Sequence, residues 1–82
     1  MKRKRGEIEE WLKRVVFGGR RDEYVVYIRF RTEQGEVLKP IPGGVIEDFR
    51  GGLIYTRSEV IPVHRVEEIR DKNDRVIYRR RS

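Results

Sequence analysis

The only histidine of the chain, His64, is followed directly by Arg65, and this pair carries the most chemistry that the sequence offers. Histidine titrates near neutral pH, and the planar guanidinium of arginine binds phosphate oxygens through parallel hydrogen bonds. Pro62 precedes the pair, and proline suits the first position of a short helical turn. We therefore expect a turn over residues 62–65 that presents both side chains to an anion.

Two plainer interpretations of the pair stay open. His64 could be a structural or solvated residue beside a turn, and Arg65 could pair with Glu47 or Asp48. Catalysis is poorly supported, because the adjacent Glu67 and Glu68 would point to opposite faces of a strand. We therefore expect a non-catalytic protein, with a minimal phosphoesterase as the weaker alternative. One histidine and no cysteine make a metal site improbable, and no cofactor is expected.

Residues 24–31 form the strongest strand pattern, rich in β-branched and aromatic side chains. Alternation places Tyr27, Arg29 and Arg31 on its wetter face. Aromatic and basic side chains on one sheet face are a common means of binding single-stranded RNA. Tyrosine on such a face also stabilises cross-strand pairs without any ligand, so both interpretations stay open.

The composition predicts one small domain. The chain has 82 residues, of which 41% are charged and 37% hydrophobic, with no cysteine. No apolar run approaches the roughly 20 residues of a membrane span, so we expect a soluble, cytoplasmic protein without a membrane partner. Abundant Arg, Glu and Lys are typical of heat-adapted proteins, which favours a thermophilic source.

The positive charge is concentrated at the two ends. Four basic residues at 2–5 and three arginines at 79–81 exceed the net charge of +6, so the body between them is close to neutral. We divide the chain into a basic tail over 1–5, a single domain over 6–78 and a basic tail over 79–82. Clustered cations at a terminus are usually solvated, and they also attract a phosphate backbone.

The expected fold class is α+β, with one N-terminal helix packed on a strongly curved antiparallel sheet of about five strands. Residues 7–17 carry apolar side chains at a helical period, ending at Gly18-Gly19. Gln34-Gly35 predicts a hairpin turn, the segment 45–49 is too short to classify, and no internal repeat is expected. Strands are predicted over 24–31, 36–41, 53–56, 60–61, 66–71 and 75–80.

Three segments resemble a family of small archaeal proteins. They are the strand start at 24–28, the middle segment Ile41-Pro42-Gly43-Gly44-Val45-Ile46 and, above all, Ile61-Pro62-Val63-His64-Arg65-Val66. The family's domain also occurs beside RNA ligase-like domains in eukaryotic proteins and has been proposed to recognise RNA ends that carry a 2′,3′-cyclic phosphate. Two positions depart from the family: Phe30-Arg31 stands where an Arg-Gly pair is usual, and Tyr78 where tryptophan is common.

Together these observations lead us to expect a non-catalytic RNA-binding domain that recognises RNA ends or a terminal phosphate. The expected contacts are His64, Arg65, Arg29, Arg31 and Tyr27. The alternative is a structural or protein-interaction domain of an RNA-processing complex, without RNA contact of its own. Its expected mark is an exposed apolar patch around Val45, Ile46 and Phe49.

Overall fold

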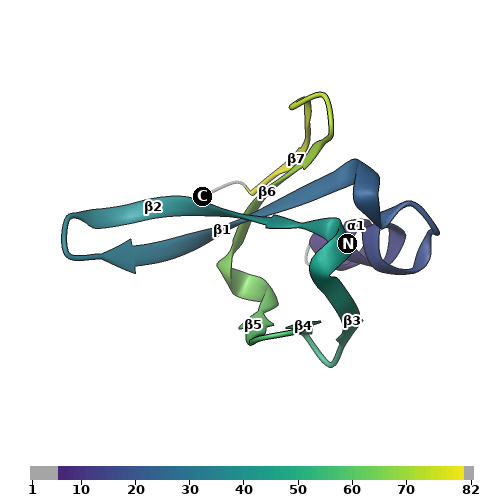
Figure 1. Cartoon of the computed structure of the whole chain (residues 1–82), viewed down its shortest axis with the longest axis horizontal. Helices are drawn as coiled ribbons and strands as arrows, with labels where there is room; N and C mark the ends of the chain where they lie inside the picture. Colours follow the sequence, from purple (N-terminus) through teal and green to yellow (C-terminus); the bar gives the residue numbers. More distant parts are fainter. Residues whose placement is uncertain (1–5, 81–82) are drawn as a thin grey trace.

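The computed structural model describes residues 6–80, which contain one α-helix, three short 3-10 turns and seven strands (Figure 1). The expected α+β class is confirmed. The helix is α1 (Gly6–Phe17), and the turns are η1 (Arg21–Glu23), η2 (Gly43–Val45) and η3 (Val63–Arg65). The strands are β1 (Tyr24–Thr32), β2 (Gly35–Pro42), β3 (Ile46–Arg50), β4 (Leu53–Thr56), β5 (Val60–Pro62), β6 (Val66–Asp71) and β7 (Val76–Arg79).

The helix forms where the apolar period predicts it. Glutamates in its first turn and Arg14 in its last turn suit the helix dipole. Trp11 is half-buried against the core, and the Arg14 guanidinium lies 4.8 Å from the centre of its ring. The buried face of the helix consists of Ile8, Leu12, Val15 and Val16.

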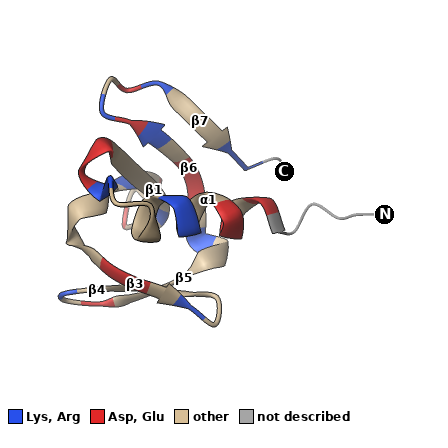
Figure 2. Ribbon diagram, turned by 90° about the vertical axis from the view of Figure 1, so that its right-hand side faces the viewer, with Lys and Arg blue, Asp and Glu red and all other residues tan. Residues whose placement is uncertain are grey.

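The strands form two sheets, so the expected single sheet of about five strands is wrong. One sheet has the order β2-β1-β6-β7 and the other β3-β4-β5, and all pairs are antiparallel. Figure 2 shows the β3–β4–β5 sheet below the helix and β6 and β7 above it. The buried side chains of the helix and of six strands meet in one core between these elements.

Two proline corners carry the chain from one sheet to the other. Strand β2 ends at Pro42 and β5 ends at Pro62, and each is followed by a 3-10 turn. We call Pro42–Ile46 the first corner and Pro62–Val66 the second corner. Proline lacks an N–H for the ladder, and the turn after it redirects the chain. A single continuous sheet is therefore interrupted twice.

The two corners share a short sequence pattern, although we expected no internal repeat. Residues 41–49 (IPGGVIEDF) and 61–69 (IPVHRVEEI) align without gaps. The φ and ψ angles are −60° and 139° at Pro42 and −64° and 141° at Pro62. The equivalent apolar residues are all buried, namely Ile41, Ile46 and Phe49 in the first copy and Ile61, Val66 and Ile69 in the second.

The likeness extends to the strand pairing and to the hydrogen bonds. The ladder register shifts at Glu47 after the first corner and at Glu67 after the second. An arginine then donates to the first carbonyl of each following strand: Arg21 to Ile46, and Arg80 to Val66. The corners therefore share a backbone design and differ mainly in the side chains at the three turn positions.

The β1–β2 hairpin extends beyond the core (Figure 1). The pairing of β1 with β6 extends only as far as Ile28–Val66, so the last residues of β1 pair with β2 alone. Phe30 is consequently 40% exposed, and the Lys39 ammonium lies 4.9 Å from its ring centre. Next to the point where the pairing of β1 with β6 stops, η3 of the second corner contacts β1.

None of the helices in the described part of the chain has the length and apolar character needed to cross a bilayer.

Candidate anion-binding site

Four of the five predicted site residues surround one surface pocket of about 200 Å³, which we call the anion pocket. Its lining consists of Arg29 and Arg31 from β1, Glu36 from β2, and His64 and Arg65 from η3. Strand alternation brings the two β1 arginines to one face, and the second corner carries the other pair toward them. Four basic side chains thus meet a single carboxylate, an arrangement that favours a negatively charged group.

Arg29 holds the second corner in place. Its Nη2 donates to the backbone oxygen of His64 at 3.0 Å, and its Nε lies 2.8 Å from Oε2 of Glu67. The contact with Glu67 is ionic only, because the buried Nε–H is not aligned with an acceptor. Arg29, predicted as a direct RNA contact, therefore has its guanidinium engaged within the protein.

Arg80 holds the same corner from the other side. Its Nε donates to the Val66 oxygen at 2.9 Å and its Nη2 to the Val63 oxygen at 3.4 Å. The Arg80 backbone N–H also donates to the Glu67 oxygen at 2.8 Å, which extends the β6–β7 pairing. Together with Arg29, the two side-chain contacts of Arg80 occupy the carbonyls of Val63, His64 and Val66 in the corner.

The remaining basic side chains of the pocket are accessible. His64 is exposed and Arg65 is partly exposed, and neither side chain has a hydrogen bond or ion pair with another residue of the range 6–80. Arg31 has an 80% exposed side chain and only a 3.9 Å contact with Glu36, its cross-strand neighbour. These three side chains are available to a ligand.

The alternative partners considered for Arg65 are engaged elsewhere. Glu47 lies 3.7 Å from Arg57, and Asp48 lies 3.3 Å from Arg50. Both acidic residues belong to β3 in the other sheet. The interpretation of Arg65 as their ion-pair partner is therefore wrong.

The first corner differs from the second in its turn residues and in the segment that packs over them. Its turn carries Gly43, Gly44 and Val45, and η1 packs over it. Oδ1 of Asp22 lies 2.6 Å from the point that a β-carbon on Gly44 would occupy. The position equivalent to Gly44 in the second corner is His64. One corner is thus covered by a carboxylate of the chain itself, while the other presents basic side chains at its surface.

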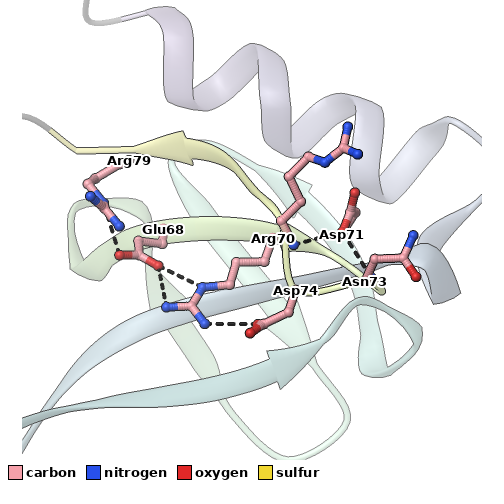
Figure 3. A network of polar contacts seen from close by, with 7 residues as sticks. Glu68, Arg70, Asp71, Asn73, Asp74 and Arg79 are labelled. Atoms are coloured by element: carbon pink, nitrogen blue, oxygen red, sulfur yellow. Dashed lines mark hydrogen bonds and ion pairs between the residues drawn. The ribbon is translucent and has the colours of Figure 1, made fainter.

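Tyr27 lies apart from the anion pocket. The Arg70 guanidinium covers its ring at 4.4 Å from the centroid, so one ring face is already occupied. Arg70 and Arg79 both bind the buried Glu68, and Arg70 also binds Asp74 (Figure 3). These hydrogen bonds raise the pKa of Arg70, first through Asp74 and then through Glu68. The predicted stacking role of Tyr27 therefore competes with an internal cation–π contact.

The terminal charges are only partly described. Residues 1–5, 81 and 82 lie outside the described range. Arg79 and Arg80, which we assigned to a solvated basic tail, bind Glu68 and the second corner respectively. Sequence reasoning missed these roles because a run of arginines contains no signal for a distant carbonyl or carboxylate. Glu36 was also missed, although the Gln34-Gly35 turn sets the register that places it opposite Arg31.

The expected mark of the protein-interaction alternative is absent from the described surface. Ile46 and Phe49 belong to the buried core, and only Val45 of that group is exposed. The predicted apolar patch is therefore wrong. Within residues 6–80 there is also no cluster of three or more potential metal ligands.

Comparison with known proteins finds no matching family model, no matching curated protein and no matching solved structure.

Proposed function

We propose that this protein is a non-catalytic RNA-binding domain that recognises an RNA end through its terminal phosphate. His64 and Arg65 contact the phosphate, and Arg31 reaches it from the hairpin. Arg29 and Arg80 act as positioning residues, because their guanidiniums hold the corner that carries the first two. The family resemblance points to the same ligand chemistry.

The observation that carries this proposal is the convergence of four basic side chains on one pocket, two of them without a partner in the described range. An arginine that binds phosphate in two parallel hydrogen bonds is a strong and directional contact. Solubility alone does not require an arginine to lie beside a histidine and two further arginines, since like charges repel. The second corner therefore fits an anion supplied from outside the chain.

The test is a titration with RNAs that end in a hydroxyl, a linear phosphate or a cyclic phosphate, at two salt concentrations. We expect the phosphate-ended RNAs to bind more tightly than the hydroxyl-ended RNA. Arg65→Ala should weaken their binding about tenfold or more at both salt concentrations, since a charge-assisted hydrogen bond is lost. The slope of log K against log salt should fall by about one unit.

The matched control is Arg57→Ala, which removes one exposed arginine from the turn between β4 and β5. It lowers the net charge equally but leaves the anion pocket intact, so RNA binding should change less than about twofold. Removal of residues 2–5 should matter mainly at low salt, because it removes only screened charge. Equal affinities for Arg65→Ala and Arg57→Ala would defeat the assignment of the site.

A further inference from the structure

A second pocket adjoins the anion pocket on the same face of the hairpin. It measures about 380 Å³ and is lined by Arg29, Glu36, Val37, Leu38 and Glu67; we call it the side pocket. Arg29 and Glu36 line both pockets, so the two lie side by side. Even without the anion pocket, the volume of the side pocket lies within the range of about 300–1,000 Å³ that is usual for small-ligand sites.

The register of the hairpin places Arg29, Glu36 and Leu38 on one face, whereas Val37 pairs with Phe30 on the other face. Leu38 lies directly across from Arg29, and Glu36 lies across from Arg31. Because alternate residues of a strand point to the same side, Leu38 presents an apolar surface beside the charged groups. Leu38 is 42% exposed. Exposed apolar surface bordered by polar groups is typical of a binding groove.

The two carboxylates of the side pocket, Glu36 and Glu67, can accept hydrogen bonds. Glu67 contacts Arg29 through Oε2, and no contact with a described residue involves its other oxygen. Glu36 has only the 3.9 Å contact with Arg31. Ionised carboxylates accept but do not donate hydrogen bonds, so the pocket suits a group that combines an apolar face with N–H or O–H donors.

We propose that the side pocket holds the base and sugar of the terminal nucleotide whose phosphate occupies the anion pocket, an inference that rests on the proposed function. An unstacked RNA base offers a flat apolar face and polar edges. The two carboxylates favour bases with an amino group over uracil. Guanine fits best, because its N1–H and N2–H₂ groups form adjacent donors. The ligand class is thus a nucleoside phosphate at an RNA end.

The test compares the affinities of the full chain for four small ligands: guanosine 3′-monophosphate, uridine 3′-monophosphate, ribose phosphate and inorganic phosphate. Binding is measured by calorimetry and by the NMR shifts of the His64 and Leu38 amides. We expect the guanosine ligand to bind about tenfold more tightly than ribose phosphate, since one well-placed apolar contact has an effect of that order. The uridine ligand should lie between them.

Leu38→Ser should abolish the gain that the base provides while leaving the affinity for inorganic phosphate, which occupies only the anion pocket, unchanged. Its matched control is Val60→Ser, because Val60 is 51% exposed but belongs to the other sheet. That variant should bind all four ligands as the parent does. Glu36→Gln should reduce the ratio of guanosine to uridine affinity toward one.

The outcomes separate this inference from the proposed function. Equal affinity for all four ligands, with loss of binding in Arg65→Ala, would overturn the nucleoside pocket and leave the phosphate site standing. Binding of no ligand, or binding that Arg65→Ala does not affect, would overturn both proposals. A preference for the uridine ligand would overturn the assignment of the carboxylates as base acceptors.

Discussion

Individual arginines around the second corner have two distinct functions. Arg29 and Arg80 direct their guanidiniums to backbone carbonyls, while Arg31 and Arg65 remain accessible at the pocket. The first pair determines where the corner lies, and the second pair determines what it can bind. Substitutions should therefore separate into those that lower stability and those that lower affinity.

A comparison of Arg29→Ala with Arg31→Ala measures this separation. Arg29→Ala leaves the His64 carbonyl without its donor and Glu67 without its cation, so the free energy of unfolding should fall by about 1–3 kcal/mol. Arg31→Ala removes only an exposed pair with a 3.9 Å contact, so its cost should stay below about 1 kcal/mol. Urea unfolding monitored by the fluorescence of Trp11 gives both values. Equal losses for the two variants would show that Arg29 has no structural role.

At the scale of elements, the chain uses one corner design twice and covers only one of the two copies. The first corner is covered by η1, and this close packing requires small residues at its turn. A β-carbon on Gly43 would overlap the backbone oxygen of Arg21, whereas one on Gly44 would meet the carboxylate of Asp22. The second corner has Val63 and His64 at these positions, and within residues 6–80 no segment like η1 packs over it.

The two glycines should consequently respond differently to alanine. Gly43→Ala forces a backbone segment to move, so we expect a loss of about 1–3 kcal/mol in unfolding free energy. Gly44→Ala displaces only the end of a flexible Asp22 side chain, and its cost should be below about 1 kcal/mol. Thermal unfolding followed by circular dichroism compares the variants. A larger loss for Gly44→Ala than for Gly43→Ala would contradict the packing described here.

At the scale of the whole molecule, the highly charged composition and short turns predict resistance to heat. Networks of ion pairs contribute more to the stability of a protein as temperature rises, because the free-energy cost of removing charges from water falls. The contacts that join Glu68, Arg70, Asp74 and Arg79 form such a network. Calorimetry should give a Tm above about 65 °C, the upper end of the usual mesophile range. A Tm inside that range would remove the thermophilic interpretation.

Local patterns predicted most of the elements. The helix follows from its apolar period, β1 from its β-branched run, and the turn at 62–65 from the proline before it. The division into two sheets was not predictable from these patterns, because sheet membership depends on the direction that each corner gives to the chain. The repeat was also missed, since GGV and VHR have no identical residue at any equivalent position.

The candidate site was predictable as a set of residue types but not as a set of contacts. Alternation along β1 placed Arg29 beside Arg31, and the turn joined His64 to Arg65. The contact of Arg29 with the His64 carbonyl and that of Arg80 with Val66 connect residues far apart in the chain. No local spacing specifies such contacts, so sequence reasoning assigned Arg29 to a ligand and Arg80 to solvent.

The paired corners also bear on how such a protein could change over evolutionary time. The apolar residues at 41, 46 and 49, like those at 61, 66 and 69, anchor each copy in the core. At the second corner, His64 and Arg65 can vary without loss of these anchors, whereas close packing restricts the turn of the first corner to small residues. New specificities could therefore arise at one corner while the other preserves the scaffold, which makes the uncovered corner a natural starting point for directed evolution toward other anions.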